Sequence, residues 1–397
     1  MSFEPTSRVK VRRMASVVRG YVYRIKPSNK QLELIEKTFG CSRQMWNVLL
    51  SERETIYEMY RDYPELLQSH NYTNPSAIKQ FYPYMYEVDS QALTTAWMNL
   101  TQAFKNFFGG THQKPIMKSR HNPVQSYTTH TTNNNIRLHG KKLKLPKLGW
   151  VKIKLHRSLP DGSILKAATI KKEAGKYYVS LRIQYEQEEK SPSSVQSVIG
   201  LDYSLRHLYI DHHGNTASYP MYYKKSLEKL AKEGRILSRR KKGSTRWKKQ
   251  KRKVQQLHQH IKNQRHDFLH KASRYLVNNY DMICIEDLDL QEMTKTKHFR
   301  KSISDTAYGF FTRVLDYKAK DEGKTLIKID KYYPSSKTCS VCGEQQDIAL
   351  TERTYTCTCG HQMDRDQNAA INIATQGLLK QYKAYGTDAI ARSICAH

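Results

Sequence analysis

The sequence lacks any apolar run long enough to cross a bilayer, which requires about 20 consecutive apolar residues. The first twenty residues contain Arg and Lys and no hydrophobic segment typical of a secretion signal. No internal repeat of fixed period is present either. These absences argue against an integral membrane protein, and we expect a soluble, cytoplasmic protein without a membrane partner.

Acidic residues are few for the length of the chain. The 397 residues include 36 Asp and Glu against 67 Lys and Arg, so the formal net charge is +31. A surplus of this size favours a polyanionic partner such as nucleic acid, because phosphates neutralise the charge and release counterions on binding. With 38% hydrophobic residues the chain can still form packed cores. A wholly disordered protein is therefore excluded, and two or three domains are expected.

Cysteine is scarce as well, and four of the seven cysteines lie close together near the C-terminus. They form two pairs, Cys339 with Cys342 and Cys357 with Cys359, and a glycine follows each pair. This spacing predicts a closed, structural Zn²⁺ site rather than a disulfide framework. The second pair has one spacer residue instead of two, which leaves His361 as a reserve ligand.

Hydrophobic periodicity predicts an α+β or α/β protein with several domains. Residues 21–25 alternate like a strand, residues 28–115 are mostly helical in pattern, and residues 124–190 contain short alternating runs between turns. The first strand has no nearby partner, so we expect it to join the later strands in a small barrel into which the helices are inserted. The aromatic residues at helical spacing, which we expect to pack in the core, are Trp97, Phe104 and Phe107.

In the second half of the chain, two short apolar runs each end in an acid. Residues 198–201 lead to Asp202, and residues 282–285 lead to Glu286. Both patterns predict buried strands. Between them, from about 224 to 278, a very basic region has apolar residues at helical spacing, which predicts a helical hairpin whose charges face solvent or phosphate.

A third acid, Asp366, stands at the start of the last predicted helix. Carboxylates in such places can converge at one edge of a sheet. Three of them suit two Mg²⁺ ions about 4 Å apart, which would activate a water and stabilise the leaving oxygen in phosphodiester cleavage. Asp366 could instead cap its helix, and Asp287, Asp289 and Asp364 are neighbours that could take the same roles.

Several segments resemble, in order, the signatures of TnpB proteins, which insertion sequences encode and which are compact relatives of type V CRISPR effector nucleases. The strongest are IGLD at 199–202, ICIEDL at 283–288, YPSSKTC at 333–339 and DRDQNAA at 364–370. The resemblance spans roughly residues 18–376. Further matches are FGCSR at 39–43, KNFF at 105–108, RRKKGS at 239–244 and DFLH at 267–270.

The resemblance implies an RNA-guided DNA endonuclease of a transposable element, with guide RNA and target double-stranded DNA as partners in the bacterial cytosol or nucleoid. It assigns the catalytic, Mg²⁺-binding acids to Asp202, Glu286 and Asp366. The implied domains are a wedge-like β-barrel (1–27 and 116–190), a helical recognition domain (28–115), a RuvC-type, RNase H-like nuclease domain (195–334 and 361–380), a zinc ribbon (335–360) and a disordered tail (381–397).

In such systems guide pairing reads most of the target, and protein side chains read only a short adjacent motif. Within residues 131–135, Thr132 and Asn133 qualify, because Asn pairs with adenine and a Thr methyl can contact thymine. Tyr72 and Thr94 are weaker candidates in the helical region. The basic residues expected to contact nucleic acid are Arg239, Arg240, Lys241 and Lys242.

Three alternatives stay open at this point. The chain could be a non-cleaving RNA-guided regulator, although all three acids are present. It could be an RNase H-fold transposase that joins DNA ends, although those enzymes usually end their acid set with Glu rather than with a residue like Asp366. It could also be a miniature type V CRISPR effector, since the chemistry would be the same. Whether one or two chains assemble on a guide is undecided.

Overall fold

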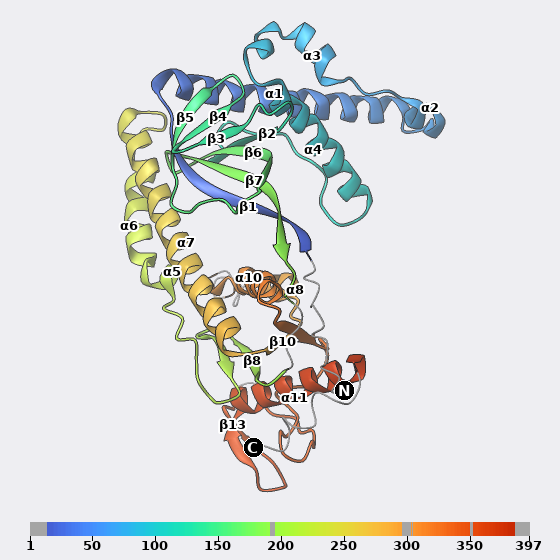
Figure 1. Cartoon of the computed structure of the whole chain (residues 1–397), viewed down its shortest axis with the longest axis vertical. Coiled ribbons are helices and arrows are strands. Elements are labelled where there is room, and N and C mark those ends of the chain that lie inside the picture. Colours follow the sequence, from blue (N-terminus) through green and yellow to red (C-terminus); the bar gives the residue numbers. More distant parts are fainter. Residues whose placement is uncertain (1–13, 191–194, 296–302, 304, 350–351, 386–397) are drawn as a thin grey trace, which may run out of the picture. The chain divides into compact units, whose positions relative to one another are not determined.

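The computed structural model describes residues 14–190, 195–295, 303, 305–349 and 352–385. The chain divides into two compact units, residues 1–188 and 189–397, and each is described by itself. Both units combine helices with sheets (Figure 1). Among the described residues, none of the helices is both long enough and apolar enough to cross a membrane.

The first unit is built on a curled, seven-stranded antiparallel sheet (Figure 1) with the order β2-β6-β7-β1-β5-β4-β3. The expected partnership of the first strand is confirmed, because β1 pairs with β7 along most of its length and with β5 at its end. The strands are β1 (Met14–Lys26), β2 (Val124–His130), β3 (Arg137–His139), β4 (Lys142–Leu145), β5 (Gly149–Lys154), β6 (Ile164–Glu173) and β7 (Lys176–Glu188).

The helices of this unit lie between β1 and β2 in the chain. The first begins with a capping box, in which Ser28 accepts from the backbone of Gln31 and the Gln31 side chain accepts from the backbone of Ser28. The helices are α1 (Asn29–Tyr60), α2 (Pro64–Ser69), α3 (Pro75–Phe81), a 3₁₀ helix (Pro83–Glu87) and α4 (Ser90–Phe108).

The helical core forms where α1 packs against α4, and it differs in one residue from the expected stripe. Trp97 and Phe104 do pack against buried residues such as Met45 and Leu93. Phe107 is half-buried too but is not among the residues of this cluster, and its ring contacts Phe108 instead. The prediction that Phe107 is a core residue was therefore wrong.

The second unit contains a four-stranded sheet with the order β11-β10-β8-β9, in which β8, β10 and β11 are parallel and β9 is antiparallel. One face packs on α7 and α10, and the opposite face packs on α11. A small two-stranded ribbon of β12 and β13 precedes α11. The strands are β8 (Val198–Ser204), β9 (Leu208–Asp211), β10 (Met282–Glu286), β11 (Thr325–Ile329), β12 (Thr354–Thr356) and β13 (Gln362–Asp364).

The expected basic hairpin is present as two helices that pack on each other. They are α6 (Leu227–Ser238) and α7 (Thr245–Asn279), and α5 (Tyr222–Lys225) precedes them. The other helices are α8 (Leu290–Lys295), α10 (Tyr308–Asp321) and α11 (Arg365–Tyr385). The tail expected to be disordered from residue 381 is helical as far as residue 385, because α11 continues for five more residues, and residues 386–397 lie outside the described part of the chain.

Candidate active site and metal centre

The pairing of β8 with β10 places two of the predicted acids side by side. The two strands are parallel, and Leu201 pairs with Ile285 at the last paired position. Asp202 and Glu286 are the next residues along each strand. Neighbouring strands lie about 4.8 Å apart, and residues at equivalent positions point to the same face. Asp202 and Glu286 therefore leave the same edge of the sheet in the same direction.

The third acid reaches this edge because α11 lies directly on β8. Gly200 is two residues before Asp202 and therefore shares its face. A Cβ atom at Gly200 would lie 2.1 Å from the carbonyl oxygen of Ala370, so the helix backbone touches the strand at this point. Asp366 is one helical turn before Ala370, on the same side of α11. Because Gly200 has no side chain, α11 can lie close to β8, and this brings Asp366 toward Asp202 and Glu286.

The electrostatics of the three carboxylates are consistent with their being neighbours. Burial raises the pKa of Asp202 well above its usual range, and the carboxylates of Glu286 and Asp366 raise it further. Burial also raises the pKa of Glu286, although a hydrogen bond from the hydroxyl of Ser335 opposes that rise. Like charges brought together in a partly buried place are relieved either by protonation or by a bound cation. The arrangement therefore fits a divalent ion with oxygen ligands.

Two arginines lie beside Asp366 in the structure. Its carboxylate is 3.7 Å from the guanidinium of Arg353 and 3.5 Å from that of Arg365. The three acids are not drawn together as tightly as metal ligands, since the four cysteines are the single group of three or more ligating side chains within 4.8 Å of one another in the part of the chain that is described. Mg²⁺ sites rely on few carboxylates and on water, so a looser carboxylate cluster still suits that ion.

The neighbouring acids have other roles. Asp364 accepts hydrogen bonds from the backbone N–H groups of Asp366 and Gln367, both at 3.0 Å, and so caps α11. Asp287 is exposed and its carboxylate is 2.7 Å from the ammonium of Lys328. Asp289, at the start of α8, accepts from the backbone N–H of Glu292 at 3.0 Å. The cap proposed as an alternative role for Asp366 thus belongs to Asp364.

A buried tyrosine also borders the acids. Tyr308, at the start of α10, is 2% exposed, and its hydroxyl has no hydrogen-bond partner among the described residues. Burial raises its pKa, and the carboxylates of Glu286 and Asp202 contribute to the rise. The centroid of its ring lies 4.4 Å from that of Tyr203, with the two planes tilted by 47°, and the Tyr203 hydroxyl is 2.9 Å from that of Thr306. The sequence contains no signal that would have singled out Tyr308.

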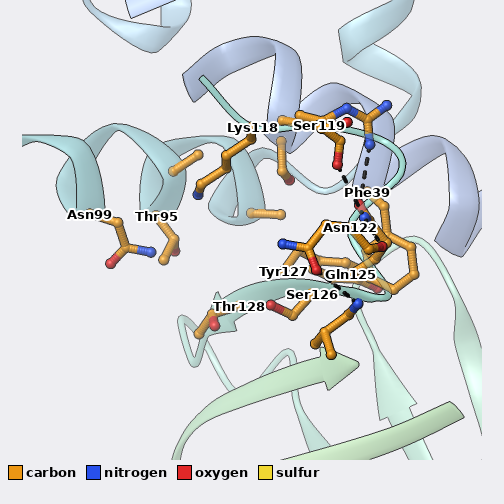
Figure 2. Close-up of a pocket in the computed structure, with 15 residues that line it drawn as sticks. Phe39, Thr95, Asn99, Lys118, Ser119, Asn122, Gln125, Ser126, Tyr127 and Thr128 are labelled. Carbon is orange, nitrogen blue, oxygen red and sulfur yellow. Dashed lines mark hydrogen bonds between the residues drawn. The ribbon is translucent and has the colours of Figure 1, made fainter. Parts of the chain in front are cut away.

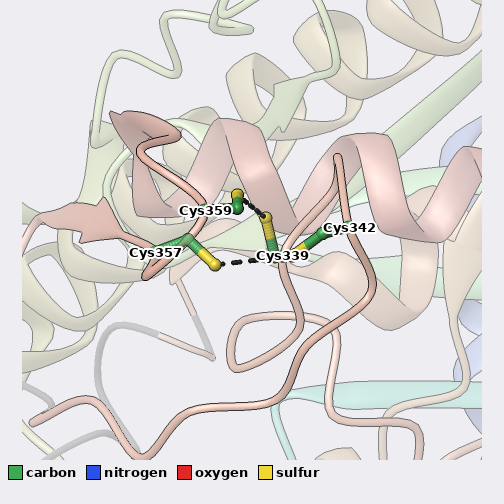
Figure 3. Close-up of side chains that lie close together, drawn as sticks. All are labelled: Cys339, Cys342, Cys357 and Cys359. Carbon is green, nitrogen blue, oxygen red and sulfur yellow. Dashed lines mark hydrogen bonds between the residues drawn. The ribbon is translucent and has the colours of Figure 1, made fainter.

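The four cysteines converge from two loops (Figure 3), as their spacing predicted. The sulfur of Cys339 is 3.8 Å from that of Cys359, and the sulfur of Cys342 is 3.5 Å from that of Cys357. Four sulfurs bound at 2.3 Å to one tetrahedral Zn²⁺ are about 3.8 Å apart. The distances therefore fit a Zn²⁺ ion, despite the short spacer between Cys357 and Cys359.

Backbone groups prepare one of the thiols for a metal. Burial tends to raise the pKa of Cys339, but hydrogen bonds from the backbone N–H groups of Cys342 and Val341, together with those from the thiols of Cys342 and Cys357, lower it to about 7. His361, the expected reserve ligand, is outside the four-sulfur group. Its Nε2 is 3.4 Å from the hydroxyl of Ser340, and its carbonyl accepts from the N–H of Cys357.

The four basic residues in the hairpin connection, residues 239–242, are not equivalent. Arg239, Lys241 and Lys242 are exposed, as expected for contacts with phosphates. Arg240 is half-buried and donates to the carbonyl of Arg246 at 2.7 Å, so it also closes the turn into α7.

The expected base-reading residues have mixed surroundings. Tyr72 is half-buried beneath the guanidinium of Arg53, 4.7 Å from its ring centroid, and Thr94 donates to a carbonyl of its own helix. Thr132 and Asn133 are exposed in a tight turn, in which Asn133 has a φ of +48°. The Asn is suited to that left-handed conformation as well as to a base contact.

A polar pocket of about 240 Å³ lies within the first unit, between α1, α4 and β2 (Figure 2). The guanidinium of Arg43 donates to the side-chain carbonyl of Gln125 at 3.2 Å across it, and the hydroxyl of Ser42 is buried there. The polar side chains of this pocket, which the sequence-based reasoning missed, include Ser42, Arg43, Thr95, Asn99, Lys118 and Gln125. They come from separate segments, so no local pattern marks them.

Models of three protein families match the chain. They are the IS605 OrfB family, described as "Probable transposase", over residues 182–297, the "Cas12f1-like, TNB domain" over 308–373, and a "Helix-turn-helix domain" over 14–62. The last description does not fit the geometry, because residues 14–62 form β1 and the single long helix α1.

Full-length relatives agree with the family models. A protein of Streptomyces pristinaespiralis named "Putative RNA-guided DNA endonuclease" is 32% identical over 92% of this chain and 90% of its own. A protein of Escherichia coli K12 with the same name and the suffix InsQ is 28% identical over 91% and 92%. The fold is similar to Cas12f1 in its complex with guide RNA and target DNA, with a TM-score of 0.54 at 12% identity over 90% of this chain and 99% of that one. The chain belongs to the TnpB/IS605 family.

Proposed function

We propose that this chain is an RNA-guided DNA endonuclease of a transposable element, which cuts target DNA beside a short adjacent motif. The observation that carries the proposal is that Asp202 and Glu286 follow the paired ends of the parallel strands β8 and β10, with Asp366 near them at the start of α11. A net charge of +31 supports a nucleic-acid substrate. The relatives named as RNA-guided DNA endonucleases, and the likeness to Cas12f1 in complex with guide RNA and target DNA, support both the reaction and the guide.

The three acids would hold Mg²⁺ through their carboxylate oxygens. Bound there, the ion supplies an activated water and neutralises the charge on the leaving oxygen of the phosphodiester. The chain contributes the orientation of its carboxylates: the β8–β10 register aligns Asp202 with Glu286, and the cap at Asp364 fixes the first turn of α11, from which Asp366 projects. Arg353 and Arg365 balance the charge of Asp366.

The proposed domains follow the units of the fold. Residues 195–334 and 361–385 would form the RuvC-type nuclease domain, with the four-cysteine segment 335–360 as a zinc ribbon inserted before Asp366. In the first unit, the curled sheet would be the wedge domain and α1 to α4 the recognition domain. The match of residues 308–373 to the Cas12f1-like TNB domain supports the position of the ribbon.

Two surfaces are proposed for nucleic acid. The exposed basic residues at 239, 241 and 242 would neutralise phosphates of the guide or target. Thr132 and Asn133 would read the adjacent motif. The polar pocket in the first unit is a further candidate, because the amide of Asn99, which lines it, offers a donor and an acceptor of the kind that pairs with a base edge.

The decisive test compares Asp202→Asn with Asp287→Asn. Each chain is purified with its bound RNA, that RNA is sequenced, and a matching DNA library with randomised flanks is added with Mg²⁺. Asp202→Asn should abolish cleavage and leave RNA binding nearly intact, because only the carboxylate charge is lost. Asp287→Asn should cut normally, since Asp287 is exposed and paired with Lys328.

Three outcomes would change the conclusion. Undiminished cutting by Asp202→Asn would remove the assignment of the three acids. Guide-dependent binding without cuts in the parent chain would favour the non-cleaving regulator. Absence of co-purifying RNA, together with strand joining, would favour a transposase that acts on DNA alone.

A further inference from the structure

A buried serine links the four-cysteine loop to one of the acids. The hydroxyl of Ser335 donates to a carboxylate oxygen of Glu286 at 2.5 Å, and Ser335 is 5% exposed. Its own carbonyl accepts from the side-chain amide of Asn372 on α11 at 2.8 Å. The backbone of Ser335 is therefore fixed by Asn372, while its hydroxyl is bonded to Glu286.

Two buried asparagines of α11 bind the backbone on both sides of the first cysteine. The amides of Asn368 and Asn372 donate to the carbonyl of Thr338 at 2.7 and 2.6 Å. The side-chain oxygen of Asn368 accepts from the N–H of Ser340 at 3.0 Å. Asn368 is two residues after Asp366, so these bonds connect the loop around Cys339 to the first turn of the helix that carries an acid.

The apolar core of this loop is small. Its apolar cluster consists of Cys339, Tyr355 and Cys357, with Ile348 packed against them. A segment with so small a core depends on its metal for folding, because the free energy of metal binding becomes free energy of folding. An ion bound by the four sulfurs would therefore help to fix the geometry of Thr338 and Ser340, which bind α11.

From these contacts we propose that Ser335 is a positioning residue for Glu286, and that the four-cysteine metal holds Ser335 and α11 in the arrangement that lets the acids bind their own ion. The inference rests on the proposed function, since it presumes that Asp202, Glu286 and Asp366 hold a divalent metal. Residues that orient metal ligands typically contribute 10- to 100-fold to metal affinity or activity. The ribbon would then support catalysis without touching the reacting atoms.

The first experiment measures Mn²⁺ bound to the full-length, zinc-loaded chain by electron paramagnetic resonance, after high salt has removed nucleic acid. The signal of Asp202→Asn is subtracted, so that only binding at the acids counts. Ser335→Ala should weaken this binding at least about tenfold. Ser340→Ala is the matched control in the same loop, because its link to α11 is through the backbone N–H, and it should bind like the parent. Zinc content and thermal unfolding show that each variant is folded.

The second experiment removes zinc from the parent chain with a chelator and repeats the measurement. Loss of Mn²⁺ affinity at least as large as in Ser335→Ala supports the proposal, since removal of zinc disturbs both links. Affinity within about twofold of the parent, either for Ser335→Ala or for the zinc-free chain, would overturn it while leaving the acid site intact. If the parent and Asp202→Asn bind the same amount of Mn²⁺, the acid site itself is wrong and the proposed function fails with it.

Discussion

The contact between Gly200 and α11 makes the substitution Gly200→Ala a sharp test of the site. The new Cβ would lie 2.1 Å from the carbonyl oxygen of Ala370, 2.7 Å from the backbone nitrogen of Ala374 and 2.9 Å from its Cβ. The two closest atoms belong to the helix backbone, so a rotamer change cannot relieve the clash. Ordinary contact begins at 3.4 Å, so α11 must move by about 1.3 Å or tilt.

This shift of α11 should lower both the stability of the folded chain and the rate of cleavage. Overpacking of a core typically costs about 1–3 kcal/mol. Asp366 lies one turn before Ala370, and a misplacement of about 1 Å in a catalytic arrangement can reduce the rate about 100-fold. We expect Gly200→Ala to lower the thermal midpoint and to slow guide-dependent cleavage on that scale, even at temperatures where the chain remains folded. Thermal unfolding and single-turnover cleavage measure the two effects.

Two other glycines provide controls. Gly234→Ala, on α6, has no atom within 4 Å of its new Cβ and should stabilise the helix by up to about 1 kcal/mol with unchanged cleavage. At Gly377, farther along α11, the new Cβ would lie 2.1 Å from the sulfur of Cys284, and Cys284→Ala should therefore partly rescue Gly377→Ala. Parental stability and rate in Gly200→Ala would refute the packing of α11 on β8, and with it the argument that brings Asp366 to the strand acids.

Three further predictions concern pH, buried hydroxyls and salt. Burial alone would raise the pKa of Asp281, but its carboxylate accepts hydrogen bonds from a lysine ammonium and from backbone N–H groups, which lower the pKa to about 2. The lowered pKa corresponds to roughly 2 kcal/mol of folding stability, which should be present above pH 4 and be lost as the pH falls toward 2. Asp281→Asn should therefore flatten this part of an acid unfolding curve. An unchanged curve would contradict the ion pair. Tyr308→Phe should raise the thermal midpoint, because it removes a buried hydroxyl that lacks a partner in the described structure. Tyr203→Phe should lower the midpoint, because it removes a hydroxyl that is hydrogen-bonded to Thr306. Shifts of the same sign in both variants would contradict this assignment of hydrogen bonds. Changing Lys241 and Lys242 together to Gln should reduce the salt dependence of nucleic-acid affinity by the equivalent of about two phosphate contacts. An unchanged slope of log affinity against log salt concentration would mean that these lysines do not contact the phosphates of the nucleic acid.

Much of the fold could be predicted because local patterns carried the information. Alternation marked the strand at 21–25 and its need for partners, and β1 indeed pairs with β7 and β5. The aromatic stripe on α4 was a less reliable guide. Periodicity places Phe107 on the apolar face, but whether a residue joins a core depends on which distant elements pack against it, and this is not a local property.

The sequence by itself determined which residue types are available for chemistry and how they are spaced. The spacing of the cysteines specified a four-thiolate site, the charge surplus specified a polyanionic partner, and an acid after each buried strand specified where carboxylates would emerge. These features depend on residue type and short separations along the chain, which folding does not alter.

Only the tertiary structure decided which acids lie near one another. Asp364 and Asp366 are two residues apart and chemically identical, yet one caps α11 and the other faces the strand acids. The bond from Ser335 to Glu286 and the contact of Gly200 with Ala370 join segments that are far apart in the chain. Side-chain direction is set by helix phase and by the packing of distant elements, so no pattern within a single segment could have revealed these contacts.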